Sequence, residues 1–315
     1  MRIFENADFD FLKLRKVGYI ISGTLIAIAL VSLITPGLEA GIDFRGGTEF
    51  VVRTANAVDP VQARGPLDEA FGAGTEVKLY GSSNDILVRT TAGGDADQLQ
   101  STLVQTLESS FPGADPDIQR IDSVGPRFAD DLQRGAFFAI IGSLFVILLY
   151  IFFRFDWRYA VGAVACLAHD VLIVLGLFAL FHTIMPFSLQ IDQTIIAALL
   201  TIVGYSINDT VVVFDRIREF GQLFKTAPFG EVVNKGINST LSRTMLTSGT
   251  TMIVVLVLFL LGGEVLRGFA FALLVGIAIG TYSSIFVASP VMLWLRSKYP
   301  AAGSGARRPA TAAAA

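Results

Sequence analysis

Long apolar runs alternate with short charged segments along most of this 315-residue chain. A helix needs about 20 apolar residues to cross the hydrocarbon core of a bilayer. Six segments reach that length, and we expect each to be a transmembrane helix: 17–35, 135–153, 159–181, 193–214, 244–263 and 268–295. The pattern therefore predicts a polytopic α-helical membrane protein.

The segment between the first two spans has a different pattern, typical of a soluble domain. Short β-rich stretches at 48–53, 76–80, 85–90 and 118–124 alternate with helical patterns at 59–71 and 95–110. Asp59-Pro60 suits the start of the first helix, and Leu99, Leu103 and Leu107 form one apolar stripe on the second. The order β-α-β-β-α-β predicts an α+β ferredoxin-like domain.

Lys and Arg residues in short loops indicate which side of the membrane each loop faces. They gather before the first span, at 154–158, at 215–243 and after the last span. We therefore expect a cytoplasmic N-terminus (1–16), a first transmembrane helix (17–35), a periplasmic ferredoxin-like domain (36–130), helices two to six (131–296) with a cytoplasmic loop (215–243), and a disordered cytoplasmic tail (297–315). The long apolar run near the N-terminus suggests a retained anchor rather than a cleaved signal peptide.

Composition narrows the functional classes. Residues are 53% hydrophobic and 16% charged, and the net charge of −3 gives no sign of a nucleic-acid surface. One cysteine, Cys166, allows no disulfide within the chain. Two histidines, His169 and His182, are too few and too far apart for a metal site. We expect no cofactor, no bound metal and no enzymatic activity, and a binding role for the outer domain.

Ionisable residues inside spans are costly and are functional candidates. Asp209 lies six residues before Asp215, about 9 Å into the fourth span, with Asn208 adjacent. Arg243 begins the fifth span, and Thr247 lies on its stripe. Asp209 and Arg243 are predicted to pair along a proton pathway. Two alternatives stay open: Arg243 extends to the interface, or Asp209 makes a fixed hydrogen bond between helices.

The third span contains the pair His169-Asp170, deeper from its end than Asp209. A proton relay through Asp170 is one interpretation. A buried polar contact to a neighbouring helix is the other. The sequence leaves the role of both residues open.

Four stretches resemble one known family. Residues 41–48 include Gly41, Asp43, Arg45, Gly46 and Gly47, and by pattern alone they indicate a short extended piece ending in a Gly-Gly turn. The other stretches are 124–128, the long segment 204–219, and 238–244 followed by 247–251. In order and spacing they are similar to the SecF family of the resistance-nodulation-division superfamily, over residues 9–296.

The resemblance implies a fold and a role. Members pair with SecD in a pseudo-symmetric unit of twelve helices beside the SecYEG channel in the bacterial inner membrane, with YajC as a further partner. They use the proton-motive force to help pull polypeptide across the membrane. The resemblance also implies proton passage at the positions of Asp209 and Arg243. No SecD-like half is present in this chain, so we expect either that SecD is a separate partner or that the chain is a fragment of a fused form. The start at Met1 favours a separate chain.

Three rival functions have different sequence requirements. A small-molecule or lipid exporter of the same superfamily would need an aromatic-lined cavity, and the aromatic residues of the outer domain are expected in its core. An intramembrane protease would need a Ser–His or His-Glu-x-x-His arrangement, which the sequence lacks. In a purely structural subunit, Asp209 would be replaceable without loss.

Overall fold

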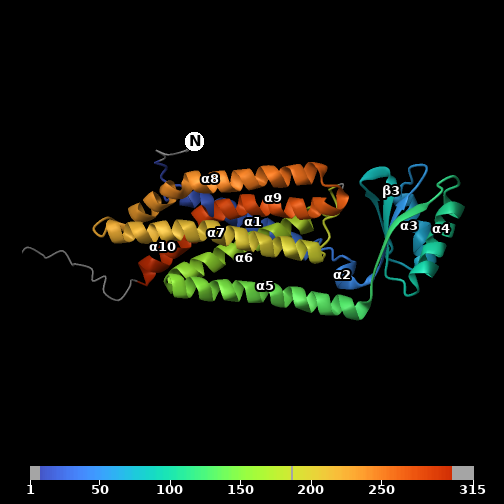
Figure 1. The fold of residues 1–315 in the computed structure, drawn as a ribbon, viewed down its shortest axis with the longest axis horizontal. Coiled ribbons are helices and arrows are strands. Elements are labelled where there is room, and N and C mark those ends of the chain that lie inside the picture. The colour runs from blue at the N-terminus through green and yellow to red at the C-terminus, as the bar shows by residue number, and fades with distance from the viewer. Residues whose placement is uncertain (1–7, 186, 300–315) are drawn as a thin grey trace, which may run out of the picture.

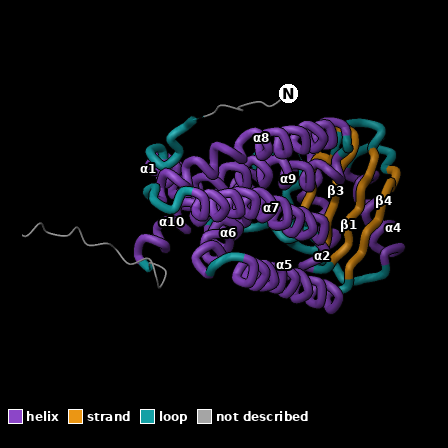
Figure 2. Tube along the Cα trace, turned by 60° about the vertical axis from the view of Figure 1, so that its left-hand side comes forward, coloured by secondary structure: helices purple, strands orange, loops and turns teal. Residues whose placement is uncertain are grey.

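The protein consists of a helical bundle with a small sheet domain at one end (Figure 1). This computed structural model describes residues 8–185 and 187–299. Six helical segments are long and apolar enough to cross a membrane, as predicted. The start of α1 and the end of α10 lie at the end of the bundle opposite the sheet domain (Figure 2). The ends of the prediction, 1–7 and 300–315, lie outside the described residues.

The bundle contains α1 and α5 to α10. Their bounds are α1 Arg15–Ile34, α5 Pro126–Arg154, α6 Trp157–Phe181, α7 Gln193–Leu223, α8 Phe229–Leu261, α9 Glu264–Ser283 and α10 Ser289–Lys298. The π-helical turn η1, Ser284–Ala288, joins α9 to α10.

The sheet domain confirms the predicted β-α-β-β-α-β order. Its strands are β1 Gly47–Arg53, β2 Glu76–Tyr80, β3 Ser82–Thr90 and β4 Asp117–Val124, in spatial order β2-β3-β1-β4 with every neighbouring pair antiparallel. Helices α3 Pro60–Phe71 and α4 Ala96–Ser110 cover the face away from the bundle. This topology is the ferredoxin-like one.

The central strand β1 is buried on both faces. Phe50 and Val52 are fully buried in the core beneath α3 and α4, together with Leu67 and Leu103. The alternate residue Glu49 points the other way and is also buried. Because side chains alternate along a strand, one face of the sheet packs on its own helices and the other meets the bundle.

Helices α1 and α6 lie side by side in constant register. His169 contacts Ser22, and Gly176 lies against Ala29, so one seven-residue step separates the two contacts on each helix. The helices approach closely at Gly176, where an added Cβ would stand 2.2 Å from the Cβ of Ala29. Small residues are what allow two membrane helices to approach this closely.

Three segments differ from the sequence prediction. Residues Ile42–Arg45 form a helical turn, α2, and not an extended piece, because Gly41 and Gly46 flank it as caps. The predicted loop 215–243 is mostly helix, since α7 continues to Leu223 and α8 starts at Phe229. The sixth span is not one regular helix: Pro290 has no N–H and its ring crowds the preceding turn, which favours the π turn just before it.

Candidate functional site

Asp209 lies near the middle of α7 and is buried, with 4% of its surface exposed. Its carboxylate accepts a hydrogen bond of 3.3 Å from the Ser248 hydroxyl on α8. The Thr281 hydroxyl on α9 donates in turn to Ser248, at 2.7 Å. Asp209 thus connects three helices through two hydroxyl groups.

The other predicted residues of this region do not contact Asp209. Asn208, Arg243 and Thr247 are exposed on the outer faces of α7 and α8, and no ion pair joins Asp209 to Arg243 within the described residues. The Thr247 hydroxyl bonds its own helix, at the carbonyls of Arg243 and Thr244. In this conformation the carboxylate has one hydroxyl partner, Ser248, and Arg243 is exposed on α8.

A second buried carboxylate, Asp170, lies on α6 with 1% of its surface exposed. Its Oδ2 accepts hydrogen bonds from Ser206 on α7, at 2.6 Å, and from Ser283 on α9, at 2.9 Å. Its Oδ1 lies 2.9 Å from Nδ1 of His169. The Cys166 thiol contacts the same cluster through Ser283. The structure therefore joins His169 and Asp170 in one polar cluster at the centre of the bundle.

The cluster continues to α1. Nε2 of His169 lies 3.1 Å from the Ser22 hydroxyl, which lies 3.0 Å from the Tyr282 hydroxyl. The Tyr282 hydroxyl donates to the backbone carbonyl of Gly18 at 2.7 Å. Tyr282 and Ser283 directly precede the π turn, and such turns are frequent at functional sites.

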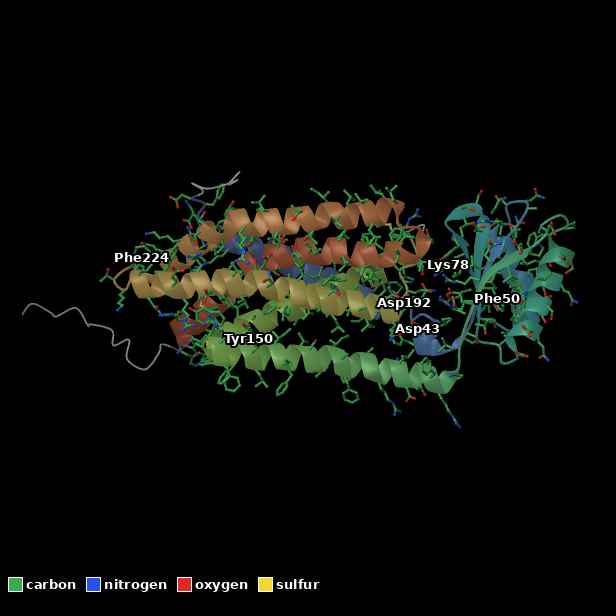
Figure 3. The ribbon with its side chains drawn as sticks, in the orientation of Figure 1. Asp43, Phe50, Lys78, Tyr150, Asp192 and Phe224 are labelled. Carbon is green, nitrogen blue, oxygen red and sulfur yellow. The ribbon has the colours of Figure 1, made fainter. Side chains whose placement is uncertain are left out.

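The glycine-containing segment 41–47 ties the sheet domain to the start of α7. The Gly41 amide donates to the Ile191 carbonyl at 2.8 Å, and Asp43 accepts from the Gln193 amide at 2.9 Å. Asp192 caps α7 beside it (Figure 3), and burial together with the Asp43 charge raises the pKa of Asp192. The helix that carries Asp209 thus begins at a joint with the outer domain.

Gly46 and Gly47 are required by the backbone of this joint. Both have positive φ angles, 73° and 124°. A Cβ on Gly47 would stand 2.5 Å from the Thr90 carbonyl oxygen of β3, so no side chain fits there. Arg45 is exposed and reaches Glu76 at 3.5 Å.

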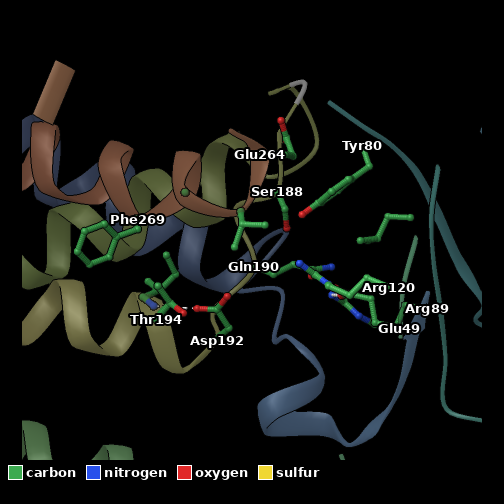
Figure 4. A pocket seen from close by; sticks show the side chains of 14 residues that line it. Glu49, Tyr80, Arg89, Arg120, Ser188, Gln190, Asp192, Thr194, Glu264 and Phe269 are labelled. Carbon is green, nitrogen blue, oxygen red and sulfur yellow. Dashed lines mark hydrogen bonds and ion pairs between the residues drawn. The ribbon is translucent and has the colours of Figure 1, made fainter. Parts of the chain in front are cut away.

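The face of the sheet that meets the bundle carries a network of charged groups around a cavity of about 80 Å³ (Figure 4). Arg89 is buried and pairs with Glu49 and, at 3.2 Å, with Glu76. Arg120 reaches Glu49 at 3.0 Å, and Tyr80 also lines the cavity. Each buried charge has a partner, as the cost of burying it requires.

Glu39 and Gln190 link this network to the bundle. Lys78 on β2 pairs with Glu39 at 2.7 Å, and the Gln190 amide donates to both Glu39 and Glu76. Burial acts to raise the pKa of Glu39, but the hydrogen bonds from Lys78 and Gln190 overcome this effect and hold it at about 2. Burial and the neighbouring Glu39 raise the pKa of Glu76.

Sequence reasoning missed the hydroxyl partners of the two carboxylates. Ser22 lies on α1, Ser206 on α7, and Tyr282 and Ser283 on α9, and nothing in their local patterns sets them apart from ordinary helix-packing residues. Among the described residues no group of three or more His, Cys, Asp or Glu could hold a metal ion. The polar cluster is suited to holding and passing protons and offers no metal site within these residues.

Family models match most of the chain. Residues 104–298 match the C-terminal model of the protein export membrane proteins SecD and SecF, and residues 31–58 match the SecD/SecF GG motif. The second match contains the joint at Gly41–Gly47. The first contains Asp170, Asp209 and Arg243.

Named relatives and solved structures agree with the family models. The protein translocase subunit SecF of Rhodothermus marinus is 58% identical over 312 residues, which cover 99% of this chain and 100% of that one. The protein translocase subunit SecF of Haemophilus influenzae is 41% identical, over 89% of this chain and 83% of that one. The crystal structure of SecDF from Thermus thermophilus has a TM-score of 0.82 and 38% identity, and covers 94% of this chain.

The super-membrane-facing form of SecDF has a TM-score of 0.68 and 36% identity. This chain spans 40% of the first SecDF chain and 39% of the second. The relatives named SecF are instead matched over most of their length. The six helices, the sheet domain, the two family models and the identity over nearly the whole chain show that this multi-pass membrane protein belongs to the SecF family of protein translocase subunits.

Proposed function

We propose that this chain couples the proton-motive force to late-stage polypeptide export across the bacterial inner membrane, as the SecF-type subunit of a complex with SecD and SecYEG, to which YajC also binds. Membership of the translocase family supports the export role. The observation that carries the proton coupling is the buried Asp209 carboxylate, which has a hydroxyl partner and no ion pair within the described residues.

A carboxylate in this position gains from protonation. A buried charge with no cationic partner is costly in the membrane, and a proton removes that cost. Ionised Asp209 attracts Arg243 on the neighbouring helix, and neutral Asp209 releases it. Arg243 is exposed in this conformation and makes no ion pair with Asp209 within the described residues, which corresponds to the released state. Proton binding and release at Asp209 therefore switch a contact between α7 and α8.

The outward polar face of α7 and α8 supports a helical membrane partner. Asn208 and Arg243 are exposed within or at the ends of apolar spans, where lipid gives their side chains no hydrogen bonds. Polar groups on a partner's helices would supply those bonds. The SecD half present in the matching SecDF chain is the partner we assign to this face.

The joint at Gly41–Gly47 provides the route from Asp209 to the outer domain. It bonds the start of α7 on one side and continues into β1 on the other. A shift of α7 is thereby passed to the domain that holds the emerging polypeptide. The Lys and Arg residues at the opposite end of the bundle support a cytoplasmic location for both termini and a periplasmic one for the domain.

The test is export in membrane vesicles with a clamped proton gradient and the Asp209→Asn variant, which keeps size and polarity but binds no proton. We expect the gradient-dependent part of export to be lost while the complex still assembles. Asp215→Asn is the matched control, because Asp215 lies on the same helix, is 54% exposed and pairs with Arg154 at the surface. Normal export by Asp209→Asn would refute the proposal.

A further inference from the structure

The contacts around His169 fix the direction of every hydrogen bond in the chain that links α6 to α1. A carbonyl oxygen only accepts, so the single proton of the Tyr282 hydroxyl goes to Gly18. The Ser22 hydroxyl must then supply the proton of its 3.0 Å contact with Tyr282. Because that proton is used, Nε2 of His169 must be the donor in its 3.1 Å contact with Ser22.

The same accounting sets the protonation of the His169–Asp170 pair. With a proton on Nε2, the 2.9 Å contact between Nδ1 and Oδ1 holds a second proton, on either the imidazole or the carboxyl group. Both arrangements give the pair a net charge of zero. Loss of one proton leaves Nδ1–H, an unprotonated Nε2 and a net charge of −1. Ser22 then donates to Nε2, and its contact with Tyr282 has no proton.

The burial of the pair independently indicates that its net charge is zero. His169 and Asp170 are 5% and 1% exposed, and no Lys or Arg pairs with either within the described residues. The groups that face the pair are the hydroxyls of Ser22 on α1, Ser206 on α7 and Ser283 on α9, and the Cys166 thiol on α6 itself. The next acidic residue along α7 is Asp209, three residues beyond Ser206. A net negative charge there has no ionic compensation, so the neutral, proton-loaded pair is the stable form.

We propose that the His169–Asp170 pair is a second proton-binding site of this protein, and that its proton controls the attachment of α1 to α9. When the pair passes its proton to water, its charge changes from 0 to −1 and the Ser22–Tyr282 hydrogen bond is lost. Helix α1 leads directly into the linker and joint of the sheet domain. This inference rests on the proposed proton-driven function, and it adds a transmission element, α1, that does not pass through Arg243.

The direct test reads the imidazole itself. The full sequence contains only two histidines, so His182→Gln leaves His169 as the single imidazole. We would record ¹⁵N NMR of histidine-labelled full-length protein in lipid nanodiscs between pH 5 and 8. We expect Nε2 to carry a proton at the acidic end. An Nδ1–H imidazole with unprotonated Nε2 throughout this range would overturn the proposal, whatever the outcome for Asp209.

The coupling to α1 is tested by export with the Ser22→Ala variant. We expect loss of most gradient-dependent export with assembly intact, and rescue by Ser22→Thr, which restores a hydroxyl. Ser32→Ala is the matched control, since Ser32 is also a buried serine on α1 and lies outside the polar cluster. Equal export by Ser22→Ala and Ser32→Ala would refute the role of α1. If Ser22→Ala fails to assemble, the His169 spectrum of Ser22→Thr between pH 5 and 8 decides. An Nδ1–H imidazole with unprotonated Nε2 throughout that range overturns the proposal.

Discussion

The close contact between α1 and α6 gives a quantitative prediction for Gly176→Ala. The new Cβ would stand 2.2 Å from the Cβ and 2.4 Å from the Cα of Ala29. Carbon atoms pack at about 3.5–4.0 Å, so the two helices must separate by about 1.5 Å. The obstacle is backbone, which no change of rotamer can relieve.

The separation reaches the polar cluster because the register is constant. Ser22 and His169 lie one seven-residue step from Ala29 and Gly176 on their respective helices, and their 3.1 Å contact tolerates only a few tenths of an ångström before it ceases to be a hydrogen bond. Overpacking of this kind costs about 1–3 kcal/mol. We expect an unfolding temperature lower by several degrees and a loss of export similar to that of Ser22→Ala.

The assay uses the single cysteine of the chain. Cys166 is fully buried in the bundle, so a thiol-reactive dye reports unfolding of the bundle on heating. Gly142→Ala is the control, since an added Cβ there meets nothing within 4 Å, and alanine favours a helix over glycine by up to about 1 kcal/mol. Equal dye reactivity of the Gly176→Ala and unchanged proteins at every temperature would refute the packing argument.

Three further predictions concern the joint, the sheet network and the N-terminal segment. Gly47→Ala forces a side chain into a positive-φ position against a strand carbonyl, and should destabilise the sheet domain by at least about 1 kcal/mol, seen as faster hydrogen exchange in β1. Burial acts to raise the pKa of Glu39, but the hydrogen bonds from Lys78 and Gln190 hold that pKa at about 2. The contact between Glu39 and Lys78 therefore stabilises the fold above pH 4.5, and this stabilisation is lost as the pH falls towards 2. Lys78→Met should raise the pKa of Glu39, as measured by NMR of its carboxyl carbon. Asn238→Ala removes two hydrogen bonds to the Phe9 backbone and should speed proteolysis before α1.

Each has a matched control. Gly93→Ala should leave exchange unchanged, because a Cβ there meets nothing within 4 Å. Arg127→Met removes an exposed charge elsewhere and should leave the Glu39 titration unchanged. Ser239→Ala removes a hydroxyl that bonds only its own helix and should not affect proteolysis. Equal behaviour of a variant and its control would contradict the corresponding prediction.

The fold could be predicted well because local patterns determine it. Six long apolar runs admit few alternatives in a membrane, and Leu99, Leu103 and Leu107 mark the buried stripe of α4 as expected. The helical turn at Ile42–Arg45 could not be predicted in the same way, since its shape depends on hydrogen bonds to Ile191 and Gln193, about 150 residues away.

The site could be predicted only in part. Asp170 and Asp209 stand out because ionisable residues in apolar runs are rare, and both are buried in the bundle. Their serine partners do not stand out, because a serine in a helix is ordinary until a neighbouring helix brings a carboxylate to it. The outward position of Arg243 depends on helix rotation, which the periodicity of an almost uniformly apolar span does not define.

The most direct test of the central claim is to measure proton entry and preprotein export together, in vesicles that contain the assembled complex and a pH-sensitive dye. The account predicts that export under an imposed gradient is accompanied by proton entry, and that Asp209→Asn abolishes both while Asp215→Asn abolishes neither. Export by Asp209→Asn at the normal rate, or undiminished proton entry in that variant, would contradict it.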